Sequence, residues 1–105
     1  MNVMSSVRSS NAGMTSEALR DLTVASISDD KGEEIRIIDL QGKTSLADYV
    51  IIASGRSSRH VSSMAENLAG KMKMAGISAK DEGMAQGDWV LLDGGDVIVH
   101  LFRPE

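Results

Sequence analysis

The chain has no cysteine and very few aromatic residues, and both shortages restrict what it can do. Without cysteine it can form neither disulfides nor thiolate metal sites, which fits a reducing compartment. One Phe, one Tyr and one Trp among 105 residues are too few to build a platform on which nucleic-acid bases stack. Its stability must therefore come from an apolar core.

A basic excess and a long apolar run are also absent. The net charge is −4 and the pI about 5.1, whereas proteins that bind nucleic acid usually carry a basic stripe. No apolar run approaches the roughly 18 residues of a membrane span, and no signal-peptide pattern precedes the predicted fold. We expect one soluble cytoplasmic domain with no membrane contact. Near RNA, it would bind a basic protein rather than the nucleic acid.

The stretch 48–76 organises the rest of the chain. Tyr49 to Ala53 is apolar and β-branched, as in a buried strand, and Gly55 ends it. Ser57 and Ser58 can cap a following helix, and Gly76 can close it. This helix, predicted at 57–75, has one apolar stripe at helical spacing that consists of Val61, Met64, Ala65, Leu68, Ala69 and Met72.

The residues before this stretch predict a tail, a helix and a strand. Residues 1–14 are rich in Ser and Asn without an apolar period, which predicts a disordered tail before a single domain at 15–105. Thr15 can cap a helix that Gly32 closes, and its expected inward face is Leu19, Leu22, Ser26 and Ile27. Residues 34–40 read as a strand antiparallel to the next one. Because this strand is apolar on both faces, we expect it to be covered on both sides or to lie within the sheet.

Three short strands are predicted after the central helix. They cover residues 77–80, 88–93 and 97–102, with a loop at 81–87 and a tight turn at Asp93–Asp96. The predicted order is α-β-β-α-β-β-β. This order indicates an α/β (α+β mixed sheet) fold with the central helix 57–75 packed on the sheet.

Three sets of residues are candidates for sites of chemistry. Gly55–Ser58 lies between a strand and a helix, where phosphates bind, but it matches no phosphate-binding motif and a capped turn explains it more simply. No D-x-D pair is present for a catalytic magnesium, which disfavours metal-dependent nucleotidyl transfer. His60 and His100 lack a catalytic or metal-binding spacing, so structural hydrogen bonding is the simpler interpretation. No cofactor or metal is expected.

Trp89 is the sole tryptophan, and its neighbourhood is acidic. A tryptophan at the start of a strand belongs either to the core or to an interface, and the sequence leaves both open. Asp81, Glu82 and Asp88 lie close to it along the chain and could form an acidic patch for a basic partner.

The chain as a whole resembles the ribosomal silencing factor family, also called Iojap-like, over nearly all of residues 15–103. The resemblance is specific because its elements occur in order: Gly42-Lys43, Asp48-Tyr49, Gly55-x-Ser57-Ser58-Arg59-His60, Glu82-Gly83, Asp88-Trp89 and Gly95-Asp96-Val97-Ile98-Val99-His100. It implies a nucleotidyltransferase-like fold without established enzymatic activity. Members of this family usually continue into a further C-terminal helix that this sequence does not include.

The resemblance also implies a function. Such a factor binds the large ribosomal subunit through large-subunit ribosomal protein fourteen, blocks joining of the small subunit and lowers translation, with a suggested part in large-subunit maturation. The interface expected here consists of Trp89 as apolar anchor, Glu82, Asp88 and Asp93 as acidic contacts, and Arg59 and His60 as residues that position the loop. The alternatives are a nucleotidyltransferase-like nucleotide-binding protein or enzyme and a metal-dependent hydrolase that uses His60 and His100. Homodimerisation through an edge strand or Trp89 stays open.

Overall fold

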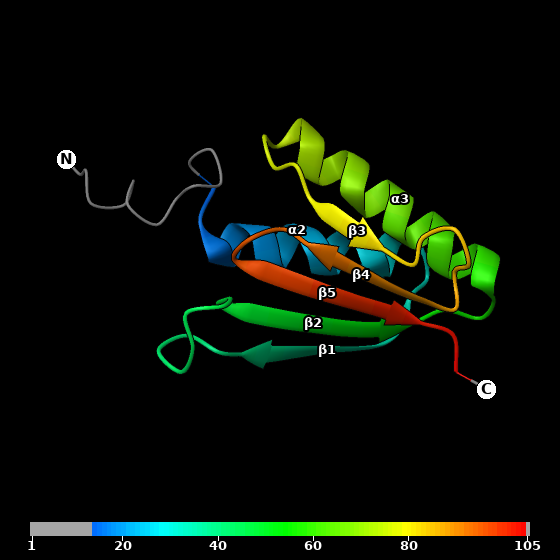
Figure 1. Cartoon of the computed structure of the whole chain (residues 1–105), viewed down its shortest axis with the longest axis horizontal. Helices are drawn as coiled ribbons and strands as arrows, with labels where there is room; N and C mark the ends of the chain where they lie inside the picture. The colour runs from blue at the N-terminus through cyan, green and yellow to red at the C-terminus, as the bar shows by residue number, and fades with distance from the viewer. Residues whose placement is uncertain (1–13, 105) are drawn as a thin grey trace.

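The structure is a computed structural model that describes residues 14–104 (Figure 1). The tail predicted at 1–14 lies, except for Met14, outside the described residues. The elements are α2 (Ser16–Asp29), β1 (Glu33–Asp39), β2 (Tyr49–Ser54), α3 (Ser58–Met74), β3 (Lys80–Glu82), β4 (Trp89–Asp93) and β5 (Val97–Phe102). This is the predicted element order, and the predicted central helix is confirmed to within one residue at each end.

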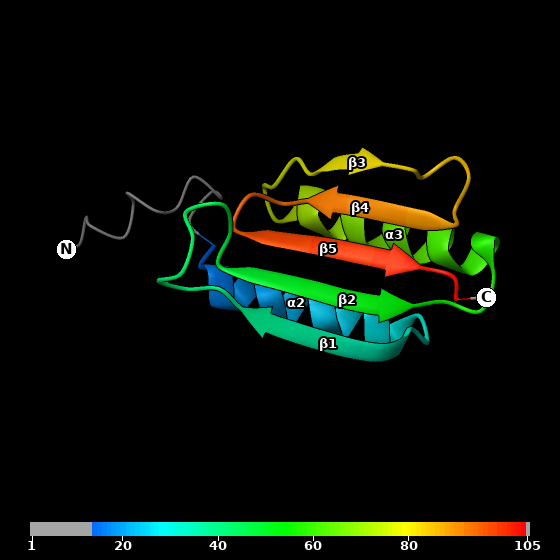
Figure 2. The ribbon, with the colours of Figure 1, turned by 60° about the horizontal axis from the view of Figure 1, so that its bottom comes forward.

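The five strands form one mixed sheet in the order β1-β2-β5-β4-β3. β2 and β5 are parallel, and the other neighbouring strands are antiparallel, including the predicted pair β1–β2. Both helices pack on the same face of this sheet (Figure 2). The molecule therefore has two layers, and one face of the sheet is left without a covering element among the described residues.

The core lies between the sheet and the two helices. β5 contributes Val97, Val99 and Leu101, which are fully buried because alternate side chains of a strand point to the same face. Ala69 of α3 is half-buried. The other five residues of the predicted stripe are buried: Val61, Met64, Ala65, Leu68 and Met72. The helical periodicity thus correctly predicted the face of α3 that packs on the sheet.

The predicted inward face of α2 is correct except at one position. Leu19, Ser26 and Ile27 are buried as expected, but Leu22 is only half-buried and Thr23 takes its place. Thr23 lies four residues after Leu19 and so on the same side of the helix. Its small side chain and that of Ser26 lie on the packed face, where α2 also contacts α3.

The expected burial of the strand at 34–40 is wrong. β1 is an edge strand, and Ile37 and Ile38 are 48% and 43% exposed. Apolar residues on both faces of this strand therefore do not indicate a central strand. They belong to an edge strand whose side chains are only partly covered. The strand is also irregular, with a register shift between Glu33 and Arg36.

The third strand begins later than predicted. The sequence favoured 77–80, whereas β3 is Lys80–Glu82, and the predicted loop 81–87 is correspondingly shorter. The reason is that Ile77 belongs to the end of α3: its N–H donates to the Met72 carbonyl at 2.8 Å and its side chain is buried. A residue that closes a helix in this way cannot also start the next strand.

Both helices end in the same hydrogen-bonded motif, which places one residue in the left-handed backbone conformation. This residue is a glycine after α3 and a lysine after α2. After α3, Gly76 has a φ of +89°, and after α2, Lys31 has a φ of +66°. In both cases the N–H of the following residue donates to the carbonyl of the third-last helical residue. After α3, Ile77 donates to Met72, and after α2, Gly32 donates to Ile27. The predicted cap at Gly76 is confirmed. At α2 the left-handed residue is Lys31 rather than Gly32.

Replacing Lys31 with glycine is therefore expected to stabilise the protein. A residue with a Cβ is strained in the left-handed region and glycine is not, so we expect a gain of about 0.5–1 kcal/mol in the free energy of unfolding. The reciprocal change, Gly76→Lys, should lower this free energy by a similar or larger amount. Urea titration followed by the fluorescence of the single tryptophan measures both. Equal stability of Lys31→Gly and the wild type would contradict the expectation.

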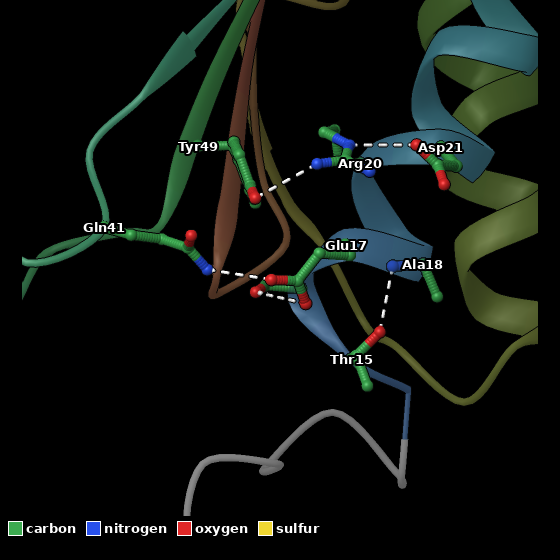
Figure 3. Close-up of polar contacts among 8 residues, drawn as sticks. Thr15, Glu17, Ala18, Arg20, Asp21, Gln41 and Tyr49 are labelled. Atoms are coloured by element: carbon green, nitrogen blue, oxygen red, sulfur yellow. Dashed lines mark hydrogen bonds and ion pairs between the residues drawn. The ribbon is translucent and has the colours of Figure 1, made fainter.

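The start of α2 is fastened to the sheet by polar contacts (Figure 3). Thr15 caps the helix, because its hydroxyl accepts the Ala18 N–H at 3.0 Å. Arg20 lies 5.0 Å above the centre of the Tyr49 ring and donates to its hydroxyl at 3.1 Å. The Gln41 amide donates to Glu17 at 3.0 Å and lowers the pKa of that carboxyl. These contacts hold the first turn of α2 against the start of β2 and the loop that precedes it.

Candidate functional site

The uncovered side of the sheet is the candidate site, and we call it the open face. In β5 the residues that alternate with the buried ones are Ile98, His100 and Phe102, all half-buried. Strand pairing places residues of the neighbouring strands beside them, because paired residues share a face. The apolar or aromatic members of the open face are Ile38, Val50, Ile52, Trp89, Leu91, Ile98, His100 and Phe102.

The register aligns these residues in rows across the strands. Val50 pairs with Ile98, and Ile52 with His100. On the other side of β5, Leu91 pairs with His100 and Trp89 with Phe102. The open face is therefore a continuous, largely apolar surface over four strands, of the kind that marks a binding site on a soluble protein.

Trp89 is the most prominent member of the open face. Its side chain is 47% exposed, so of the two interpretations that the sequence left open the core is wrong. The indole stacks on the His100 ring, with 5.6 Å between the ring centres and 30° between the planes. A large, partly exposed aromatic residue at the edge of an apolar surface has the character of an interface anchor.

Asp88, directly before Trp89, joins three parts of the chain. Its carboxylate accepts hydrogen bonds from the Ser58 hydroxyl at 2.7 Å and from Arg103 Nη2 at 3.1 Å. Its backbone carbonyl accepts the Arg103 N–H at 2.9 Å. Ser58 is the first residue of α3 and Arg103 follows β5, so this contact fixes the start of β4 against both. The hydrogen bonds from Ser58 and then Arg103, together with the charge of Arg103, hold the pKa of Asp88 below its usual value.

This lowered pKa predicts a pH dependence of stability. A carboxyl whose pKa is lower in the folded state stabilises the fold above its unfolded pKa of about 3.9, and this contribution is lost as the pH falls through the folded value. Asp88→Asn should therefore unfold at a lower temperature than the wild type at pH 7. The difference should shrink as the pH falls below about 4. Thermal unfolding by circular dichroism from pH 7 to pH 3 measures it, with the exposed Asp81→Asn as control. A difference that is constant over this range would contradict the expectation.

The predicted acidic residues do not form one cluster. Glu82 is exposed on β3 and pairs with Leu91, so it lies at the rim of the open face beyond β4. Asp93 is four residues from Trp89 along β4, about 13 Å away at the usual rise of a strand. Its carboxylate accepts the Gly95 N–H at 2.9 Å and thereby stabilises the turn to β5. Glu82 is therefore the acidic residue beside Trp89 on the open face, and the Asp88 carboxylate is directed to Ser58 of α3. Asp93 pairs with Ile98 of the open face but lies at the opposite end of the strand.

Arg59 and His60 lie in the first turn of α3, and only Arg59 is exposed. The Nδ1 of His60 accepts the Arg56 N–H at 2.9 Å, and its Nε2 lies 2.7 Å from the Asp30 carbonyl. Because a carbonyl only accepts, the imidazole carries its proton on Nε2. His60 thus ties the end of α2 to the start of α3. This agrees with the structural interpretation for His60, whereas the His100 ring makes no such hydrogen bond among the described residues.

The turn at Gly55–Ser58 is capped as predicted. The Ser57 hydroxyl accepts the His60 N–H at 3.0 Å, and Arg56 is paired with Glu33 at 3.1 Å. Within residues 14–104 no three His, Asp or Glu side chains are arranged so that they could hold a metal ion. None of the described helices is long and apolar enough to cross a membrane.

Sequence reasoning did not place Ser58, Arg103 and His100 next to Asp88 and Trp89. Ser58 and Arg103 hold Asp88, although they are 30 and 15 residues away from it in the sequence. No local pattern could have revealed this contact. His100 could have been found, because the alternation of residues 97–102 places it on the same face as Ile98 and Phe102.

Comparison with known proteins agrees with this fold. The chain matches the family described as "Ribosomal silencing factor during starvation" over residues 14–105. A relative from Zymomonas mobilis, named ribosomal silencing factor RsfS, is 51% identical over 106 aligned positions that cover 100% of this chain and 80% of the relative.

Two crystal structures are similar to the whole fold. The protein from Chromobacterium violaceum has a TM-score of 0.83 at 37% identity, covering 87% of this chain and 77% of that one. The protein from Bacillus halodurans has a TM-score of 0.78 at 33% identity, covering 83% of this chain and 82% of that one. Because the family match spans nearly the whole sequence and relatives share both sequence and fold, this chain belongs to the ribosomal silencing factor family.

Proposed function

We propose that this protein binds the large ribosomal subunit through large-subunit ribosomal protein fourteen and blocks joining of the small subunit. By doing so it represses translation in the cytoplasm, and it acts as a binding protein rather than an enzyme. Membership of the silencing factor family supports the ribosome as target. The single observation that supports this mode of binding is the open face, a largely apolar side of the sheet that no helix covers among the described residues.

The charge around the open face suits a basic partner. The chain has a net charge of −4, and Glu82 lies at the rim close to Trp89. Asp88 directly precedes Trp89, and its carboxylate is held by Ser58 of α3, at the end of the strand beside the open face. Complementary charge at a rim assists encounter and orientation, while the apolar centre contributes most of the affinity. We propose Trp89 as the apolar anchor and Glu82 as an acidic contact. Asp88, with 63% of its side chain exposed, can meet the partner while it holds Ser58 and Arg103.

The remaining predicted contacts take outer positions in this proposal. Asp93 would meet basic groups at the far end of β4, and the exposed Arg59 would contact the partner beside the start of α3. His60 would act indirectly, by holding the turn before α3 in place. Repression through steric exclusion needs no cofactor.

Co-sedimentation with purified large subunits tests the proposal. We expect saturable binding that excludes added small subunits and weakens as salt screens the acidic rim. The variant Glu82→Lys should bind more weakly, with a difference from the wild type that shrinks at high salt. Glu66→Lys is the matched control, because Glu66 is exposed on α3, on the helical side of the sheet. Equal weakening by both substitutions would place the contact elsewhere, and no binding by the wild type would refute the proposal.

Homodimerisation through the open face or an edge strand stays a prediction. If two copies bound each other through the open face, they would compete with the ribosome for it. Analytical ultracentrifugation of the chain alone, at the concentrations used for co-sedimentation, measures whether it forms dimers. If it does, the analysis of subunit binding must include this competition.

A further inference from the structure

His100 occupies the centre of the open face. It is flanked by Ile52 of β2 on one side and by Leu91 of β4 on the other. Trp89 is its diagonal neighbour on β4, within reach of an aromatic ring, and the two rings stack at 5.6 Å. The position of the imidazole is thus fixed by a three-strand register, while the indole lies at the end of a strand and is 47% exposed.

The polar atoms of His100 do not explain its place in this surface. Among the described residues its ring makes no hydrogen bond or ion pair, in contrast to His60, which makes two hydrogen bonds. The charged residues in its row are Arg36, beyond Ile52, and Glu82, beyond Leu91, and both are separated from it by an apolar side chain. The contact that distinguishes His100 is the flat stack with Trp89.

We propose that His100 is a positioning residue for Trp89 and holds the indole in one orientation on the open face. An exposed tryptophan at the start of a strand would otherwise sample several rotamers, and ordering them on binding costs affinity. A stacked ring restricts them in the free protein. The effect on the motion of the indole stands independently of the proposed function, whereas the effect on ribosome affinity rests on it.

The absence of any other tryptophan makes the motion measurable. Time-resolved fluorescence anisotropy reports on Trp89 alone, because it is the only indole in the chain. We expect His100→Ala to increase the amplitude of fast local motion of the indole while the melting temperature changes little. His100→Phe should restore the restricted motion, because it keeps a flat ring without the imidazole nitrogens. The matched control is Ile98→Ala, on the same strand and face but paired with Asp93, which should leave the indole motion unchanged.

Affinity for large subunits is the second readout. His100→Ala should weaken co-sedimentation by roughly three- to tenfold, the range expected for the loss of an aromatic pair, and His100→Phe should bind like the wild type. Unchanged indole motion in His100→Ala overturns the proposal. Motion in His100→Phe as free as in His100→Ala also overturns it, because the nitrogens rather than the stack would then matter. If the wild type does not bind subunits at all, the proposed function fails, while the anisotropy data still decide the role of His100.

Discussion

Gly83→Ala is expected to lower the free energy of unfolding by about 3 kcal/mol, through left-handed backbone strain and steric overlap together. Gly83 has a φ of +83°, a conformation that residues with a Cβ adopt only at a cost. A Cβ at this position would lie 2.1 Å from the backbone oxygen of Trp89. Because Trp89 is the first residue of β4, this oxygen can move only if the start of the strand moves. Urea unfolding followed by circular dichroism measures the loss.

Gly42→Ala is the matched control for this effect. Gly42 has nearly the same φ, +78°, but a Cβ there would meet nothing within 4 Å. It should therefore cost only the strain, about 1–2 kcal/mol. If the two variants lose the same free energy of unfolding, the steric overlap with Trp89 does not contribute to the loss. A larger loss in Gly83→Ala shows that the loop before β4 is built to admit the backbone of Trp89.

Trp89→Ala is expected to weaken binding to the large subunit about 30-fold or more, the effect of a loss of at least 2 kcal/mol at an interface anchor. The cost to stability should be small by comparison, because almost half of the side chain already contacts solvent. Co-sedimentation with purified large subunits measures the affinity, and thermal unfolding establishes that the variant is folded.

Met74→Ala provides the control for exposed apolar surface. Met74 is 90% exposed at the end of α3, away from the open face, and its removal should leave binding unchanged. The proposed interface is wrong if a folded Trp89→Ala protein binds subunits as tightly as the wild type, even when combined with Glu82→Lys.

The parts of the fold that were predicted from sequence are those with a strong local period. The stripe of α3 determines one buried face, and this face was found where expected. The strand at 97–102 was also predicted within its observed bounds. The edge position of β1 could not be predicted, because apolar residues on both faces are compatible with a central strand and with a partly covered rim. The label nucleotidyltransferase-like, taken from the family resemblance, stays a prediction.

The candidate site was only partly accessible to sequence reasoning. Proximity along the chain grouped Asp93 with Trp89, but an extended strand carries residues four positions apart to opposite ends of the sheet. Conversely, the neighbours that hold Trp89 in place come from other elements. His100 reaches it across the β4–β5 pairing, and Ser58 and Arg103 reach the residue before it. Such contacts depend on the register between strands, which a single sequence does not specify.

The strand order also has a consequence for folding. β5, the last strand described, lies in the middle of the sheet, and its parallel partner β2 precedes it by about 50 residues. Joining distant segments requires closing a long loop before the contacts compensate for the lost chain entropy, so we expect this step to be slow. Three of the eight residues of the open face, including His100, come from β5, and the strands that carry the others are joined only once β5 is inserted between them. A partly folded chain therefore lacks the surface proposed to bind the ribosome, and stopped-flow fluorescence of Trp89 should follow its completion as one late phase.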